Sequence, residues 1–114
     1  MALRRKERLA DAIKAEVSRI ILFEMTDPRV GFVTVTAVEL SGDLKQAKVK
    51  VSVMGDEREQ AVTLSVIRHA RGYIQKQLGE KLVTRSVPII SFEADDSVKR
   101  SVHLSKTIRD ALEG

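Results

Sequence analysis

Positively charged side chains gather in two short segments of this chain, and such clusters can bind a polyanion. Between residues 1 and 8, four cations and one acid give a net charge of +3, and between 68 and 85, five cations and one acid give +4. The whole chain carries only +4, so the remainder is slightly acidic. This distribution is typical of nucleic-acid binding, although charge alone favours an ordinary solvated surface. The candidate polyanion-contacting cations, which the resemblance given below assigns to RNA binding, are Arg4, Arg5, Lys6, Arg8, Arg68, Arg71, Lys76, Lys81 and Arg85.

A glycine in the second basic segment, Gly72, falls inside a pattern that otherwise predicts one long helix. An interior glycine weakens a helix, so we predict a kink at Ala70-Arg71-Gly72. A break there would place backbone N–H groups at the start of a second half-helix, and such groups bind phosphate. The alternative is a close approach of two elements that only glycine permits. Together with the local charge, the kink favours an anion site that includes Gly72. Tyr73 could stack on a base or pack in the core.

Residue constellations for catalysis are absent from the sequence. The two histidines, His69 and His103, belong to different predicted helices, and the chain has no cysteine. Asp95 and Asp96 could act as acid and base or bind a divalent ion, but aspartates directly before Ser97 are more typical of a helix cap. No phosphate-binding glycine loop or nucleophile elbow occurs. We therefore predict no catalytic residue, no cofactor and no metal site.

The elements that position the basic segments follow from hydrophobic spacing. A first helix is predicted to end at Asp27-Pro28, because proline disfavours helical geometry in the residue before it. Its apolar stripe is Leu9, Ile13, Val17, Ile20 and Ile21. A strand follows over residues 32–40, in which Val33, Val35 and Ala37 alternate with threonines.

A second strand shows the clearest alternation in the chain, and the two strands form an antiparallel hairpin across a turn at 41–43. Ala47, Val49, Val51 and Val53 lie on one side of this strand. Lys48 and Lys50 lie on the other side, where they could discourage edge pairing, so their charge need not indicate a ligand.

The kinked helix pair covers roughly residues 58–82, and acids at 56–59 favour its start. A third strand spans Ile89 to Ala94, and a final helix follows Ser97. The order is therefore α-β-β-α-(kink)-α-β-α, and we predict an α+β fold with a three-stranded sheet covered on one face by helices. Without repeats or linkers, residues 1–114 are predicted to form a single domain.

The compartment is inferred from what the sequence omits. The charged start lacks the apolar run of a signal peptide, and no segment approaches the length of a membrane span. We expect a cytoplasmic protein without a membrane partner.

Four motifs, in this order, are similar to those of the bacterial ribosome-binding factor A family, over about Leu3 to Leu112. They are Asp27-Pro28-Arg29, the run from Asp43 to Val49, Ala70-Arg71-Gly72, and the run from Val87 to Phe92 followed by Asp95 and Ser97. The order of elements also resembles a type II KH domain, an RNA-binding fold.

The resemblance implies a non-enzymatic factor that binds 16S rRNA and the free, immature small (30S) ribosomal subunit late in its maturation. It also implies support for 5′-end processing of the rRNA precursor, notably in the cold. In this family the kink replaces the Gly-x-x-G loop of ordinary KH domains. We expect a monomer with no small-molecule substrate.

One residue separates Ala70 from Gly72, whereas two residues separate the glycines of the KH loop, and Ala70 carries a Cβ where that loop has a glycine. A backbone clamp on single-stranded bases is therefore disfavoured. We expect recognition of phosphate positions by Arg and Lys, with a slope of log K against log salt of about −4 to −6 for roughly five to seven neutralised phosphates. Two alternatives stay open. One is an α/β protein-interaction or ligand-binding regulatory module that dimerises through a sheet edge. The other is an enzyme that uses Asp95, Asp96 and His103.

Overall fold

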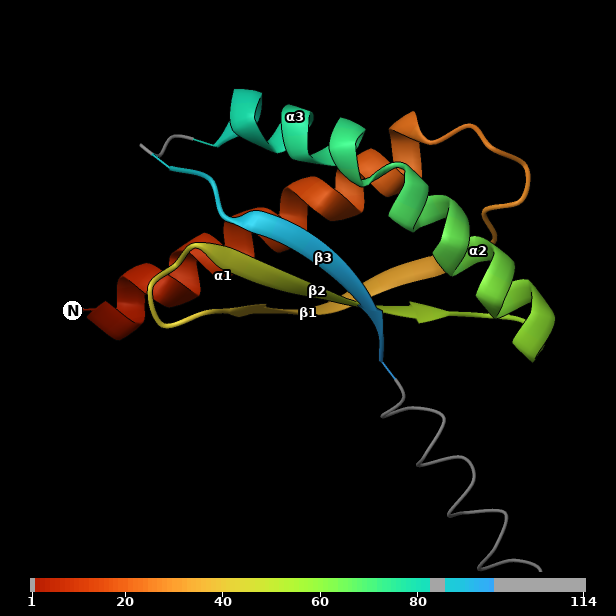
Figure 1. The fold of residues 1–114 in the computed structure, drawn as a ribbon, viewed down its shortest axis with the longest axis horizontal. Coiled ribbons are helices and arrows are strands. Elements are labelled where there is room, and N and C mark those ends of the chain that lie inside the picture. The colour runs from red at the N-terminus through yellow and green to blue at the C-terminus, as the bar shows by residue number, and fades with distance from the viewer. Residues whose placement is uncertain (1, 83–85, 96–114) are drawn as a thin grey trace, which may run out of the picture.

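The computed structural model describes residues 2–82 and 86–95 of the 114-residue chain. In that part of the chain, the elements follow the order α1, η1, β1, β2, α2, α3, β3 (Figure 1). The helix pair lies between the second and third strands, so the predicted α+β fold of type II KH-like order is confirmed. The final helix predicted after Ser97 lies outside the described residues. None of the helices in the described ranges is long and apolar enough to cross a membrane.

The first helix, α1 (Ala2–Arg19), buries the apolar stripe that the sequence predicts, with Ile13 and Val17 fully inaccessible. It continues directly into a π-helical turn, η1 (Ile20–Glu24), in which the Met25 amide donates to the Ile20 carbonyl at 3.1 Å. The helical segment therefore ends at Glu24, before the predicted stop at Asp27-Pro28. Its last turn is wider than an α-helix because the bond joins residues five apart.

The sheet contains β1 (Val33–Leu40), β2 (Gln46–Val53) and β3 (Ile89–Ala94), with β2 in the middle. The β1–β2 pair is antiparallel, as predicted, whereas β2 and β3 are parallel. The side chains that β2 buries are Ala47, Val49 and Val51. Because β2 is the central strand, the suggestion that Lys48 and Lys50 guard an edge is wrong.

An irregularity in β1 changes which of its side chains face the core. The register shifts between Val35 and Ala37, so that Ala37 pairs with Lys50 and Val38 pairs with Val49. An extra residue in one strand shifts its alternation by one position. The prediction that Ala37 shares a face with Val33 and Val35 is therefore wrong.

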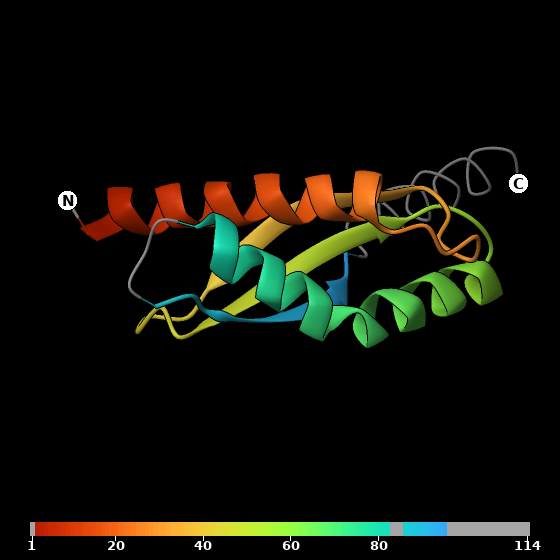
Figure 2. The ribbon, with the colours of Figure 1, turned by 90° about the horizontal axis from the view of Figure 1, so that it is seen from above.

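The helices α1, α2 (Glu57–His69) and α3 (Arg71–Lys81) cover one face of the sheet. In this layer, α1 packs on β1, while α2 and α3 pack along β3 (Figures 1 and 2). Helix α2 starts at the predicted acids, and the Asp56 carboxylate caps it by accepting a hydrogen bond from the Glu59 amide at 2.8 Å. Ile67 and Ile74, on either side of the helix break, are fully buried, so both half-helices are anchored in the core next to the break.

Candidate nucleic-acid interface

The break between α2 and α3 lies at Ala70, within the predicted kink. The backbone angles there are φ −84° and ψ 2°, and the Ala70 amide donates to the carbonyls of Val66 and Ile67, each at 3.1 Å. The Ala70 carbonyl accepts the Ile74 amide at 3.0 Å, which begins the bonding of α3. The amides of residues 71–73 precede that bond and thus lack a partner within α3 itself. The kink therefore presents the start of a helix, as the sequence predicts.

The break lies at Ala70 rather than at Gly72, which is exposed in the first turn of α3. A Cβ built at this position would meet no atom within 4 Å, so the alternative of a close approach that only glycine permits is wrong. Because Gly72 has no side chain, the outer surface of the backbone is accessible there, and a ligand can approach the amides of the first turn of α3.

The free edge of β3 is covered by side chains of the two half-helices. Gln75 accepts the Ile90 amide through Oε1 and donates to the Pro88 carbonyl through Nε2, both at 2.9 Å. Arg68 donates to the Phe92 carbonyl from Nε at 3.4 Å and from Nη2 at 3.2 Å. These bonds take the places that an added strand would use. A single strand of nucleic acid or peptide could pair along this edge only after displacing them.

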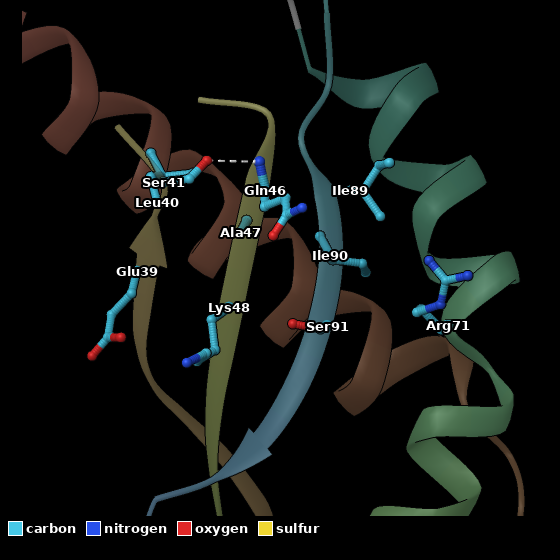
Figure 3. A pocket seen from close by; sticks show the side chains of 10 residues that line it. All are labelled: Glu39, Leu40, Ser41, Gln46, Ala47, Lys48, Arg71, Ile89, Ile90 and Ser91. Carbon is cyan, nitrogen blue, oxygen red and sulfur yellow. Dashed lines mark hydrogen bonds between the residues drawn. The ribbon is translucent and has the colours of Figure 1, made fainter. Parts of the chain in front are cut away.

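Arg71 reaches from the start of α3 over this covered edge toward the open face of the sheet. It lines a recess of about 620 Å³ together with Ile89 and Ser91 of β3 and Gln46 and Lys48 of β2. Figure 3 shows Arg71 beside Ile89 and Ile90, with Lys48 on the other side of β3. The recess thus connects a kink cation with the polar face of the sheet.

The two lysines of this open face share one carboxylate, which offsets one of their two positive charges. Lys48 and Lys50 both pair with Glu93, at 3.3 Å each, and this pairing lowers the pKa of the Glu93 carboxyl. The cation with the greatest freedom around the recess is therefore Arg71.

The predicted RNA-contacting cations fall into three groups. Arg68 is bonded to β3, and Arg85 lies outside the described residues. The others make no ion pair or side-chain hydrogen bond to any residue in the described ranges, and all except the half-buried Lys6 are exposed. These unpaired cations are Arg4, Arg5, Lys6, Arg8, Arg71, Lys76 and Lys81.

The two basic segments belong to neighbouring helices, since α1 and α3 are in contact. The N-terminal end of α1 and the C-terminal end of α3 lie at the same end of the molecule, on the left in Figures 1 and 2. The cations therefore extend from this end of the helix layer to the break.

Tyr73 is not a core residue, so that alternative is wrong. Its side chain is 47% exposed, and its hydroxyl donates to Glu24 of η1 at 3.0 Å. This bond to a carboxylate raises the pKa of Tyr73. Glu24 is held in turn by Arg19 at 3.0 Å, so the tyrosine is fixed at the junction of η1 and α3.

His69 and Asp95, the two residues considered for catalysis that lie in the described ranges, have structural partners. His69 Nδ1 lies 2.9 Å from the Ser65 carbonyl, and Asp95 accepts a hydrogen bond from Thr36 across the sheet. Asp96 and His103 lie outside the described residues. No group of three or more potential metal ligands occurs among the described side chains.

Sequence reasoning missed Gln75, because a glutamine inside a helix carries no signal of its partner. It also assigned Arg68 to RNA without its bond to β3. Both contacts depend on where β3 lies, and spacing along one helix cannot show that.

Comparison with known proteins gives a consistent result. A family model described as ribosome-binding factor A matches residues 5–108. A ribosome-binding factor A of Desulfitobacterium hafniense is 40% identical over 109 residues, which cover 96% of this chain and 87% of the relative.

Two solved structures are also similar to this chain. The crystal structure of ribosome-binding factor A from Thermus thermophilus superposes with a TM-score of 0.69 at 26% identity, covering 78% of this chain and 93% of that one. A homology model of the Thermus factor, fitted into a cryo-electron microscopy map of its 30S complex, gives a TM-score of 0.56 at 25% identity. That match covers 75% of this chain and 93% of the fitted one.

Proposed function

The chain belongs to the ribosome-binding factor A family, and we propose that it is a ribosome assembly factor that binds the small ribosomal subunit. The observation that carries this proposal is the match over residues 5–108 to a family with a member fitted into a 30S complex. The unpaired cations of α1 and α3 support it, because they are free to bind phosphate.

We further propose the finer features of this role. The partner is 16S rRNA in the free, immature subunit, and binding supports 5′-end processing of the rRNA precursor, notably in the cold. Residues 1–114 act as one cytoplasmic, monomeric domain without catalytic activity. The covered edge of β3 counts against the alternative of a regulatory module that dimerises there.

Recognition is proposed to depend on phosphate positions rather than on base sequence. The bonds from Gln75 and Arg68 occupy the strand edge, so single-strand pairing along it is disfavoured. Seven of the predicted cations, on α1 and α3, make no ion pair or side-chain hydrogen bond within the described residues. Neutralisation of roughly five to seven phosphates gives a slope of log K against log salt of about −4 to −6.

The test is sedimentation of the tagged protein with ribosomal particles at moderate and at high salt. We expect co-migration with free small subunits and not with large subunits or assembled ribosomes, and release at high salt. Protein that stays at the top of the gradient at both salt concentrations would contradict the proposal.

A further inference from the structure

A second recess, of about 500 Å³, lies between the turn after η1 and the end of α2, where the two segments run side by side (Figure 1). It shares no lining residue with the recess of Arg71, and its volume is within the roughly 300–1,000 Å³ typical of small-ligand sites. The residues that line it are Met25, Thr26, Asp27, Arg29, Ser65, Val66, His69 and Ala70.

Arg29, whose side chain is 65% exposed, is oriented in this recess by Asp27. The Asp27 carboxylate accepts Nε of Arg29 at 3.0 Å and Nη2 at 2.7 Å, which fixes the plane of the guanidinium. The same carboxylate accepts the Arg29 amide at 2.9 Å. The buried Thr63 hydroxyl, from α2, donates to the Arg29 carbonyl at 3.2 Å. The backbone and the side-chain head of Arg29 are thus fixed before any ligand arrives.

The opposite wall of the recess belongs to the end of α2. The Ser65 carbonyl can only accept, so Nδ1 of His69 carries a hydrogen and donates it to this carbonyl. Met25, Val66 and Ala70 add apolar surface, while Thr26 and Ser65 add hydroxyl groups. The recess combines two flat polar groups, the Arg29 guanidinium and the His69 ring, with apolar side-chain surface.

The charge of the recess disfavours a phosphate. Hydrogen bonds from the Arg29 side chain and amide hold the pKa of Asp27 at about 2, so its carboxylate is ionised near neutral pH. The negative charge of Asp27 offsets that of Arg29, and the site is close to neutral. A flat, neutral ligand with hydrogen-bonding edges fits this chemistry better than an anion does. Unpaired nucleobases have these properties, and they stack on arginine planes and on histidine rings.

We propose that this recess holds one unpaired nucleobase of the bound RNA, stacked on the guanidinium of Arg29. The inference deepens the proposed function and rests on it, since the base must belong to the ribosomal RNA that the chain binds. Arg29 and His69 provide the stacking surfaces, and Asp27 and Thr63 are positioning residues for Arg29.

The experiment measures the affinity of the full chain for free small subunits and for protein-free 16S rRNA over a range of salt concentrations. Arg29→Ala should weaken binding to both by about 5- to 150-fold, the range that one stacked base supports. The salt slope should not change, because stacking releases no counterions. His69→Ala should act in the same direction and does not depend on the fold of the turn. Arg71→Ala is the matched control, and it should reduce the magnitude of the slope.

Three results would overturn the base-binding inference. They are unchanged affinity in both the Arg29 and His69 variants, a slope lowered by Arg29→Ala as much as by Arg71→Ala, and a loss seen with particles but not with protein-free rRNA. The second would indicate a phosphate, and the third a ribosomal protein. If the unaltered chain binds neither particles nor rRNA, the proposed function itself fails, so the two failures are distinguishable.

Discussion

The two recesses beside the helix break differ in how each holds its arginine. Arg71 makes no hydrogen bond or ion pair with any residue in the described ranges, and its charge is free to act on a ligand. Arg29 has its charge offset and its plane fixed by Asp27. A free arginine is suited to phosphate, whereas a fixed one offers a flat surface for stacking. The arginines of two recesses that both border the kink, one lined by Ala70 and the other by Arg71, are therefore suited to different ligands.

The largest effect is expected from reversing charge on the Arg71 side. Arg71→Glu combined with Lys76→Glu should weaken RNA binding by about 2–6 kcal/mol in sum, since each contact is worth about 1–3 kcal/mol. The magnitude of the salt slope should also fall. Filter binding at several salt concentrations measures both quantities.

The control for this reversal is Arg58→Glu, at an exposed position in the first turn of α2. It changes the net charge in the same direction at a distance from the break. If the loss of RNA affinity per reversed charge is the same in Arg58→Glu as in the double variant, only total charge matters. That result would remove the contrast between the recesses.

The next effect concerns stability on the Arg71 side. Gln75→Ala removes two backbone hydrogen bonds, one with Ile90 of β3 and one with Pro88 just before it, and should lower the free energy of unfolding by about 2 kcal/mol. Gln77→Ala, at a half-buried glutamine of the same helix with no described bond, is the matched control and should cost less. Urea denaturation compares them. If the two variants have the same midpoint, the covered edge contributes nothing.

A variant of Arg68 can distinguish the role of this residue in holding β3 from a role in RNA binding. Arg68→Met should lower the free energy of unfolding by about 1 kcal/mol, because the Phe92 carbonyl loses its donor. It should change RNA affinity less than Arg71→Met does, since part of its guanidinium is already bonded. Calorimetric unfolding and RNA titration of the two variants test this, and an equal loss of affinity would place Arg68 among the free cations.

The smallest effect is a titration on the Arg29 side. The pKa of Asp27 is lowered from 3.8 to about 2, first by the side-chain bonds of Arg29 and then by its amide. The contribution of this pair to stability is therefore present above pH 3.8 and is lost as the pH falls through about 2. Carboxyl NMR of Asp27 measures the midpoint, and Arg29→Ala should move it back toward 3.8. An unchanged midpoint would mean that Arg29 is not fixed by Asp27.

Regular patterns in the sequence predict most of the fold. The alternation in residues 47–53 predicts β2 because one face of that strand is buried and the other is wet. The bounds Ile89–Ala94 of β3 match the predicted strand. The irregularity near Thr36 was missed, because Ala37 continues the alternation of Val33 and Val35 and hides the change of phase to Val38 and Leu40.

The candidate site was predicted only in part. Composition and spacing locate the cations and predict a break within Ala70-Arg71-Gly72. The break lies at Ala70, two residues before the glycine that suggested it, and any residue can adopt the backbone angles found there. The contact of Gln75 with Ile90 joins segments 15 residues apart and depends on the tertiary fold. The Asp27–Arg29 pair is local, and an aspartate followed two residues later by an arginine could have suggested it.

The parallel pairing of β3 with β2 has a consequence for the order of folding. The β1–β2 hairpin joins neighbouring segments, whereas Gln46 pairs with Ile89, across the whole helix pair. Contacts between distant segments form late. During synthesis β3 leaves the ribosome after both half-helices, and Gln75 and Arg68 have no strand to bond until then. A nascent chain that ends before Ile89 would therefore carry Gln75 and Arg68 without the strand that they bond, so the covered edge should be complete only near the end of translation.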